Sequence, residues 1–496
     1  MNSTVALSTL RSWETRKPLQ RLRHIFRLVT LASADACAFL AADLLFRWNE
    51  GVPALTLSSS YVPMQQAAHI DVFLLLAISF IIVRCLAGDY SRRLLFWDSA
   101  RLTTKALAIA SIPDVLLLIV SKEHYSSFAI IMTWVFLIVA VPMLRQLARV
   151  AMSAIGVWHI PSAFVGDSAR AGDIHNALSA SLSLGFELRT VISTERNAML
   201  REALPQLDHV LAADAQDAVK RVRQAGCEQA VVAAEDMQSS QFADIIQSFL
   251  EADIAVAIAP TLRRLPLVGL GTSYFFGKDI LLLQVRNNLR HLPRRVLKRS
   301  FDIVGATALL MLLSPLFAAI AIAIKRFDKG PILYEHERIG HNRRPFKCLK
   351  FRTMAVDAEE RLARWQDEDP DLYEEFQKNF KLRDDPRVTR PGKWLRKTSL
   401  DELPQLINVL RGEMSLVGPR PVVESELDNY YGPAAQLYAR VQPGMTGLWQ
   451  VSGRSDTTYE ERVTYDEWYV LNWSFWYDIV ILLRTARIVL SGKGAF

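Results

Sequence analysis

Residues 303–324 read IVGATALLMLLSPLFAAIAIAI, an apolar stretch of the length that crosses a lipid bilayer. Basic residues stand on both sides of it, at 298–299 and 325–326, so both flanks carry the charge that favours the cytoplasmic side of a membrane. Ser314 and Pro315 lie near its middle, where a proline removes a backbone hydrogen bond and breaks or kinks a helix. We therefore expect a re-entrant hairpin that enters the membrane and returns on the same side. A proline-kinked span is the alternative.

The N-terminal part contains four more apolar blocks, each near the roughly 20 residues that a spanning helix needs. They lie at about 25–47, 70–88, 106–121 and 126–144. The loop at 48–69 has no Lys or Arg, whereas the loop at 89–105 has four. By the positive-inside rule this pattern predicts four transmembrane helices with both chain ends in the cytoplasm. Charged residues within or near the blocks either pair between helices or serve transport, and pairing is the favoured interpretation. They are Asp35, Asp43, Arg84 and Asp114.

From about residue 150 the sequence alternates short β-rich runs with polar helical stretches. Expected strands lie at 162–166, 186–193, 209–212, 230–234 and 254–259, and expected helices at about 170–182, 214–225 and 239–251. Such alternation is typical of a parallel α/β sheet, so we expect residues 150–285 to form a Rossmann-like domain. The stretch GDSARAG at 166–172 resembles a degenerate dinucleotide turn, but it lacks G-x-G-x-x-G and the acidic residue expected about 20 residues further on. A structural or regulatory domain is therefore favoured over a working cofactor site.

The net charge of +7 is the feature of the composition that suggests nucleic acid. Residues 1–150 hold fifteen Lys and Arg against nine Asp and Glu, so most of the excess lies among the apolar blocks. That location fits loops beside anionic lipid, and no nucleic-acid-binding motif occurs, so we expect no nucleic-acid partner. The four cysteines are scattered without a CxxC, which argues against a disulfide framework or a zinc site. No signal peptide is expected, because the first apolar block is too long and lacks a small-residue cleavage site.

The residues that suggest chemistry are concentrated at 395–421, LRKTSLDELPQLINVLRGEMSLVGPRP. Asp401 and Glu402 stand there among basic residues, and a stiff turn follows them. The spacing Ser399-x-x-Glu402 matches a capping box, which would make both acids ordinary parts of a helix start. Pro404 argues against that, because it would occupy a position whose N–H the helix needs. We expect the helix to begin at 403–404, with the acids just before its positive end.

A carboxylate pair surrounded by cations suits a divalent metal and a phosphate-rich substrate. An ionised Asp401 can attack a phosphorus atom and form an aspartyl-phosphate, and Glu402 can hold Mg²⁺. Arg396 and Arg420 suit bidentate contacts to phosphate. Phosphoryl transfer is therefore the functional hypothesis, while the spacing alone leaves surface or salt-bridge roles open for each arginine.

The downstream part closely resembles the bacterial sugar transferase family, which comprises monotopic polyprenyl-phosphate sugar-1-phosphate transferases. The resemblance covers about 285–496 and rests on a dense set of motifs. These are KRSFDIVGA (298–306), LLSP (312–315), GPILYEHERIG (330–340), FKCLKFRTM (346–354), KLRDDPRVTRPG (381–392), LRKTSLDELPQLINVLRGEMSLVGPRPV (395–422) and VQPGMTGLWQVSGRS (441–455). The four apolar blocks and the α/β region look like the large members of the family, which start O-antigen, capsule or exopolysaccharide synthesis.

The resemblance implies a role for each matching residue. It makes Asp401 the covalent nucleophile and Glu402 the Mg²⁺ ligand. It makes Arg396 and Arg420 contacts for phosphate and uridine, with the nucleotide pocket shaped by the turn at Pro419 and Pro421. The helix break falls on Ser314 and Pro315, and further substrate-binding positions in shared motifs are Lys350, Arg352, Gln450 and Arg454.

We therefore expect a bacterial inner-membrane enzyme with three parts: four transmembrane helices (1–149), a Rossmann-like domain (150–285) and a mixed, mainly helical catalytic domain with the re-entrant hairpin (286–496). A span at 303–324 would place the catalytic domain outside the cell, away from nucleotide substrates, which favours the hairpin. The expected substrates are a UDP-hexose and undecaprenyl phosphate, with the active site and both termini on the cytoplasmic face. The large family members also suggest a homodimer. Two alternatives stay open, a membrane-anchored nucleotide-sugar dehydratase and a non-catalytic regulator of polysaccharide assembly. The sequence does not fix the sugar.

Overall fold

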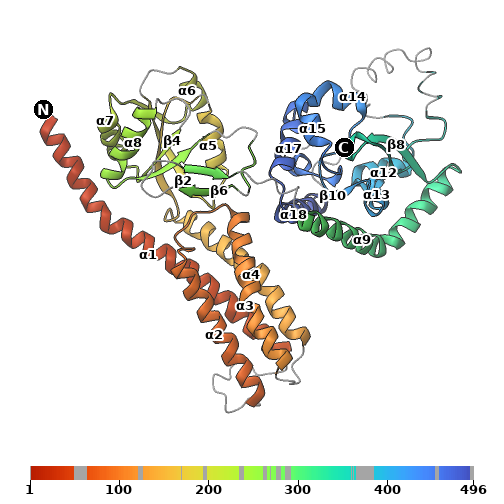
Figure 1. The fold of residues 1–496 in the computed structure, drawn as a ribbon, viewed down its shortest axis with the longest axis horizontal. Helices are drawn as coiled ribbons and strands as arrows, with labels where there is room; N and C mark the ends of the chain where they lie inside the picture. Colours follow the sequence, from red (N-terminus) through yellow and green to blue (C-terminus); the bar gives the residue numbers. More distant parts are fainter. Residues whose placement is uncertain are drawn as a thin grey trace. The chain divides into compact units, whose positions relative to one another are not determined.

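The computed structural model describes residues 2–49, 64–120, 127–168, 170–193, 198–233, 239–260, 265–268, 270–274, 281–284, 292–358, 360, 362, 364, 385–452 and 457–491. The chain divides into two compact units, Met1–Thr261 and Leu262–Phe496. The first unit contains the N-terminal helices and a parallel sheet, and the second contains the acidic pair (Figure 1). The domain boundaries expected at 149–150 and 285–286 stay predictions.

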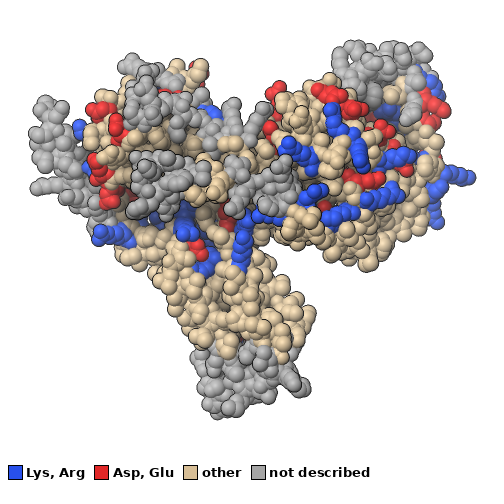
Figure 2. All heavy atoms as spheres, viewed as in Figure 1, with Lys and Arg blue, Asp and Glu red and all other residues tan. Residues whose placement is uncertain are grey.

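Four helices of the first unit coincide with the four apolar blocks. They are α1 (Asn2–Asn49), α2 (Met64–Leu86), α3 (Phe96–Val120) and α4 (Ser127–Ala154). Among the described residues, three helical segments of the whole chain are long and apolar enough to cross a membrane: Gln20–Asn49, Ser127–Ala154 and Leu292–Phe327. The described apolar part of α2, Val72–Leu86, is shorter. In Figure 2 the helices are tan away from the sheet, while Lys and Arg gather where the helices meet the sheet. Membrane association is therefore supported, and the count of four spans stays a prediction.

The charged residues of this bundle have partners, as the pairing interpretation predicts. Asp35 is fully buried and accepts hydrogen bonds from Arg145 and from the Tyr90 hydroxyl, the latter at 2.8 Å. Trp134 Nε1 donates to Asp114 at 2.8 Å. Two ion pairs complete the set, Arg47 with Asp43 at 2.7 Å and Arg84 with Asp89 at 3.1 Å. Pairing offsets much of the cost of burying charge, so loss of one partner would leave an uncompensated buried charge and destabilise the bundle.

The predicted parallel α/β sheet is confirmed. Its strands are β1 (Ile160–Val165), β2 (Phe186–Ser193), β3 (Asp208–Leu211), β4 (Gln229–Ala233) and β5 (Ala255–Ala259), in the order β3-β2-β1-β4-β5. Helices α7 (Ala215–Gln224) and α8 (Ser239–Glu251) cover one face, and α5 (Ala171–Ser179) and α6 (Ala198–Ala203) cover the other (Figure 1). The central strands β1 and β4 are almost wholly buried and read as continuous apolar runs, which made them recognisable in the sequence.

The second unit combines short strands with many helices. Its described strands form three two-stranded sheets: β6 (Gly271–Tyr274) with β7 (Leu281–Gln284), β8 (Leu333–Ile339) with β9 (Pro345–Phe351), and β10 (Ser415–Val417) with β11 (Gly444–Thr446). Its longer helices are α9 (Leu292–Phe327), α12 (Arg390–Thr398), α13 (Gln405–Arg411), α17 (Tyr459–Leu471) and α18 (Phe475–Ser491). The core collects apolar side chains from α9, β9, α13, β10, α17 and α18. This mixed, mainly helical arrangement agrees with the predicted character of the catalytic part.

Helix α9 continues through Ser314 and Pro315, and its ribbon changes direction partway along its length (Figure 1). A proline inside a helix accounts for such a bend, because it removes one backbone hydrogen bond and its ring crowds the preceding turn. The helix exposes large apolar side chains such as Met311 at 72% and Leu312 at 74%. It is therefore suited to lipid, and its path through a membrane stays a prediction.

Candidate active site

The acidic pair lies on a short turn between two helices. Helix α12 ends at Ser399, which adopts the left-handed conformation with φ 56° and makes no capping hydrogen bond with its side chain. Asp401 and Glu402 follow on the 3₁₀ turn η4 (Leu400–Glu402), and α13 begins at Gln405. The capping-box alternative is therefore wrong. The expected helix start at 403–404 is one residue early, because Pro404 stands just before the helix rather than inside it.

The same turn separates apolar from acidic side chains. In a 3₁₀ turn residues three apart lie above one another. Leu400 and Leu403 pack against an apolar cluster that includes Ile320 and Ile324 of α9 and Phe351 of β9. The two acids stand between these leucines in sequence, and Glu402 lines a polar cavity on the other side. The turn is thus fixed by apolar packing against α9, which holds the carboxylates in place.

The polar cavity collects charged side chains from distant parts of the second unit. Its volume is about 10 Å³, room for a single water. The lining residues are Arg338, Cys348, Lys350, Glu402, Gln405, Arg420, Pro421, Gly444, Met445 and Gln450. Three cations thus surround one carboxylate, an excess of positive charge that suits a diphosphate. Because the cavity is so small, these side chains would have to move apart before a nucleotide sugar could bind.

The electrostatics push the pKa values of the two acids in opposite directions. Burial and the charge of Glu402 raise the pKa of Asp401 above its usual range, and Lys350 and Arg396 act against this. Burial also opposes ionisation of Glu402, but Lys350 and Arg420 outweigh it and lower its pKa. Lys350 Nζ lies 2.7 Å from Glu402 Oε1 and donates a hydrogen bond to it. Two neighbouring carboxyl groups with different proton affinities can take two different roles.

The turn that carries Arg420 is held by close backbone packing. The Gly444 N–H donates to the Pro419 carbonyl at 2.7 Å, and the Gly418 N–H donates to the Thr446 carbonyl at 2.9 Å. The Arg420 guanidinium lies 5.6 Å from the centre of the Trp449 ring, within the range of a cation–π interaction. The backbone of β10–β11 therefore fixes where this arginine points.

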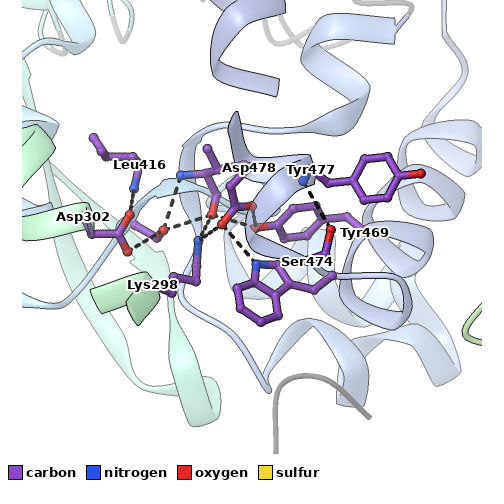
Figure 3. A network of polar contacts seen from close by, with 10 residues as sticks. Lys298, Asp302, Leu416, Tyr469, Ser474, Tyr477 and Asp478 are labelled. Atoms are coloured by element: carbon purple, nitrogen blue, oxygen red, sulfur yellow. Dashed lines mark hydrogen bonds and ion pairs between the residues drawn. The ribbon is translucent and has the colours of Figure 1, made fainter. Parts of the chain in front are cut away.

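A buried polar network ties this turn to the apolar helices. The Val417 carbonyl, one residue before Gly418, accepts hydrogen bonds from Lys298 Nζ and from the Tyr469 hydroxyl, each at 3.0 Å. Asp478, 1% exposed, accepts from the same two groups at 2.8 and 2.7 Å (Figure 3). Lys298 belongs to α9 and Asp478 to α18, so the network holds both helices against the strand that leads to Arg420.

The structure brings most of the expected site residues together. Lys350, Glu402, Arg420, Pro421 and Gln450 line one cavity, and the charges of Asp401 and Arg396 interact beside it. Arg396 Nε also donates to the Thr353 hydroxyl at 3.0 Å. Pro419 contributes its carbonyl to the turn, whereas Ser314 and Pro315 lie on α9. Arg454 lies outside the described residues.

Arg352 has different surroundings from the other residues that were predicted to bind substrate. It is buried, its Nη1 lies 3.4 Å from an Asp328 carboxylate oxygen, and its Nη2 donates to the Asp328 carbonyl at 3.1 Å. Asp328 directly follows α9. The contacts shown thus give Arg352 a part in holding the end of α9, and its substrate contact stays a prediction.

Arg338 and Gln405 are among the cavity residues that were missed in the sequence. Arg338 lies on β8 and faces the same side as Lys350, because His336 pairs with Cys348 and Tyr334 pairs with Lys350 in the antiparallel ladder. Its Nη1 lies 3.5 Å from Glu426 Oε2. Side chains alternate between the two faces of the strand formed by GPILYEHERIG, and this alternation was the available signal. Which face points into the cavity depends on how β8 pairs with β9 in the hairpin.

The acidic pair also fits Mg²⁺ by the chemistry of its donors. Mg²⁺ keeps several waters and binds proteins through one or two carboxylates together with substrate phosphates. Asp401 and Glu402 supply two adjacent carboxylates beside cations suited to phosphate. In the part of the chain that the structure describes there is no group of three or more His, Cys, Asp or Glu side chains that would hold a metal without substrate.

Comparison with known proteins gives consistent matches. The family model described as "Bacterial sugar transferase" matches residues 293–492. The chain is 35% identical over 408 residues to the "Undecaprenyl-phosphate galactose phosphotransferase" of Salmonella typhimurium, covering 82% of this chain and 84% of the relative. It is 39% identical over 417 residues to the "UDP-galactose-lipid carrier transferase" of Erwinia amylovora, with the same coverage. The "Exopolysaccharide production protein ExoY" of Rhizobium meliloti is 53% identical over 199 residues, 40% of this chain and 88% of the relative.

Proposed function

The chain belongs to the bacterial sugar transferase family, and on this premise we propose that it transfers a hexose-1-phosphate from a UDP-sugar to undecaprenyl phosphate. The reaction releases UMP and starts the synthesis of an exopolysaccharide, capsule or O-antigen. One observation supports the proposal most directly: Glu402 of the acidic pair shares a cavity with Arg338, Lys350 and Arg420, in the unit that contains the apolar helix α9. Two of the relatives that match 82% of the chain have galactose in their names, so UDP-galactose is the first donor to test.

The chemistry divides into two displacements at the same phosphorus atom. In the first, a carboxylate oxygen of Asp401 attacks the phosphorus that bears the sugar, the bond from that phosphorus to the bridging oxygen breaks, and UMP leaves. In the second, a phosphate oxygen of undecaprenyl phosphate attacks the same phosphorus, and the bond to Asp401 breaks. The product is a lipid diphosphate sugar, and the Asp401 carboxylate is restored. Covalent catalysis of this kind replaces one difficult displacement by two easier ones.

The cations of the cavity bind the diphosphate and stabilise the negative charge of the transition state. Arg338 and Arg420 can each form bidentate hydrogen bonds to a phosphate, and Lys350 adds a point charge. Glu402, with its lowered pKa, stays ionised and would hold Mg²⁺. When bound, Mg²⁺ would neutralise charge on the phosphates. Electrostatic stabilisation and positioning are most of what phosphoryl transfer requires of an enzyme.

The membrane arrangement belongs to the same proposal. Helices α1 to α4 would span the bacterial inner membrane, and α9 would enter it and return at Ser314 and Pro315, keeping the active site on the cytoplasmic face. Exposed apolar residues on α9 and its bend support this arrangement. The homodimer expected from the large family members is proposed with it. In this arrangement the long apolar acceptor need not leave the bilayer.

Release of UMP tests the proposal. Full-length protein in detergent is given undecaprenyl phosphate and Mg²⁺ with a panel of UDP-sugars, and UMP is measured for each. We expect UMP from one sugar, with formation of the matching lipid product. Folded protein that releases no UMP from any sugar would contradict the proposed function and favour the regulator alternative.

We predict that Glu402→Gln lowers turnover about a hundredfold or more, an effect of the size seen when one preorganised group that supports transition-state stabilisation is removed. The amide is neutral and a weaker ligand, so the concentration of Mg²⁺ that gives half-maximal activity should rise at the same time. Titration of UMP release with Mg²⁺ measures both effects. Glu424→Gln, an exposed glutamate in the same unit, is the matched control. An unchanged Mg²⁺ requirement in Glu402→Gln would rule out the ligand role.

We predict that Lys350→Met moves the acid limb of the pH–rate profile to higher pH. Asp401 must be ionised to attack, so activity falls as the pH drops through its raised pKa. Lys350 acts against that rise by favouring the carboxylate, and removing its charge therefore raises the pKa of Asp401 further. The profile of kcat/KM for UMP release measures the shift. Lys347→Met on the same strand, where Lys347 pairs with Glu335, is the control and should leave the acid limb in place. An acid limb at the same or lower pH in Lys350→Met would contradict this electrostatic account.

A further inference from the structure

An apolar groove lies on the opposite face of the β8–β9 hairpin from the polar cavity. Its volume is about 580 Å³, within the range of ligand-binding clefts. It is lined only by apolar residues, among them Phe317, Ala318 and Ala321 of α9, Leu333 of β8, Phe351 of β9 and Ile407 of α13. The two alanines leave space that larger side chains would fill. A groove with this lining suits a hydrocarbon and offers no donor for a phosphate.

The register of the hairpin places groove and cavity back to back. Leu333 pairs with Phe351, so these side chains share one face, whereas Lys350 and Cys348 point to the other. Phe351 in the groove and Lys350 in the cavity are consecutive residues. Only the β8–β9 hairpin separates the groove from the cavity. A molecule with an apolar chain and a charged head can therefore place its chain in the groove while its head reaches the cavity past the edge of the hairpin.

Through Phe351 the groove adjoins the apolar cluster beneath the turn that carries the acidic pair. Phe351 and the leucines at 400 and 403 belong to one apolar cluster, which α9 completes through Ile320 and Ile324. On α13, Ile407 lines the groove and Gln405, two residues earlier, lines the cavity. One wall of the groove is therefore continuous with the packing beneath Asp401 and Glu402.

The other wall of the groove is the helix suited to lipid. Next to Ala321 in sequence, α9 exposes Ile322 at 56%. A chain lying in the bilayer along the apolar part of this helix would meet the groove. Because burial of apolar surface is the only attraction the lining offers, the occupant must be a long hydrocarbon.

We infer that this groove binds the isoprene units of the acceptor lipid nearest to its phosphate. The inference rests on the proposed function and deepens it, since it assigns a binding site for the acceptor separate from the donor cavity. The donor binds the charged face of the hairpin and the acceptor chain binds the apolar face. The two substrates meet at the turn that carries Asp401, and each can be disturbed without the other.

The two half-reactions allow the inference to be tested separately from the proposed function. Full-length protein in nanodiscs is first given labelled UDP-sugar and Mg²⁺ without acceptor, and covalent labelling is measured. It is then given undecaprenyl phosphate over a range of concentrations. Ala321→Trp fills the groove, and Ala323→Trp is the matched control. Ala323 is exposed and, at 3.6 residues per turn, lies on the opposite side of α9 from the groove.

We expect Ala321→Trp to label as well as the wild type while its KM for undecaprenyl phosphate rises about tenfold or more, the change expected when burial of roughly two methylene groups is lost. Ala323→Trp should match the wild type in both assays. Equal KM values for the two variants would overturn the inference and would mean that the groove holds only membrane lipid. If the wild-type protein neither becomes labelled nor releases UMP, the result would instead contradict the proposed function.

A second measurement needs no substitution. A prenyl phosphate with a photoreactive group in its first isoprene units is bound to wild-type protein, irradiated and mapped by mass spectrometry. We expect crosslinks to Phe317–Ala321 or to Phe351, competed by undecaprenyl phosphate. Crosslinks confined to the outer side of α9, or crosslinks that undecaprenyl phosphate does not reduce, would overturn the inference even if Ala321→Trp failed to fold.

Discussion

Replacing Asp401 by Asn is expected to abolish covalent labelling by UDP-sugar and to lower UMP release at least about 10⁴-fold, as when a nucleophile is removed from other enzymes with covalent intermediates. The amide is neutral and cannot form the aspartyl-phosphate bond, so neither half-reaction can proceed through it. Mass spectrometry of the intact protein after incubation with donor measures the adduct, and UMP release measures turnover.

The same substitution should leave the fold intact. The raised pKa of Asp401 means that the folded protein disfavours its ionised form, so above that pKa the charge costs stability that a neutral amide does not. We therefore expect the Tm of Asp401→Asn at neutral pH to equal or exceed that of the wild type. Asp428→Asn is the control, since Asp428 is exposed and pairs only with Arg343 among the interactions shown. Persistent labelling of Asp401→Asn would place the nucleophile elsewhere.

The opposite pKa shifts of the two acids explain why the site holds a pair. Glu402 is kept ionised by Lys350 and Arg420, which suits a residue that holds a cation. Burial and the charge of Glu402 raise the pKa of Asp401, so its anion is less well stabilised before the reaction, which fits the nucleophile role proposed for it. Loss of Lys350 would disturb both acids, which is why the pH profile of its variant is informative.

Features of the structure that depend on local sequence patterns could be predicted from the sequence alone. The strands β1 to β5 could be located within about two residues, because short β-rich runs alternate with polar helical stretches in the sequence. The acids at 401–402 stood out because they form a pair among basic residues, and Pro404 argued against an ordinary capping role for them. In both cases neighbouring residues carry the signal, and no distant contact is needed to read it.

The remaining features depend on contacts between distant residues. Arg338 reaches the cavity only because β8 pairs with β9 in one particular register. Arg352 was expected at the substrate, yet its contacts run to Asp328, 24 residues away. Ser399 takes a left-handed conformation that its side chain does not favour, because α12 must end there. The path of α9 depends on the membrane as well as on the chain.

Gly444→Ala is expected to have a large effect although it changes no charged residue. Strands β10 and β11 approach so closely that a Cβ at 444 would overlap the Gly418 backbone nitrogen and lie 2.6 Å from the Thr446 carbonyl oxygen. Both are backbone atoms and cannot rotate away. The two strands would have to separate, which breaks the hydrogen bonds at Pro419 and Gly418 and moves Arg420 away from Glu402.

We therefore expect Gly444→Ala to lower UMP release about a hundredfold or more and to lower stability by roughly 1–3 kcal/mol or more, the usual cost of overpacking. Gly271→Ala is the matched control, because a Cβ there would meet only the Gln284 side chain, at 3.6 Å, an ordinary contact. Turnover per folded protein and thermal unfolding of both variants measure the two effects. If Gly444→Ala kept full activity, Arg420 would not need the placement that β10–β11 gives it. The position of that arginine would then be set by substrate, and the rigid turn would serve folding alone.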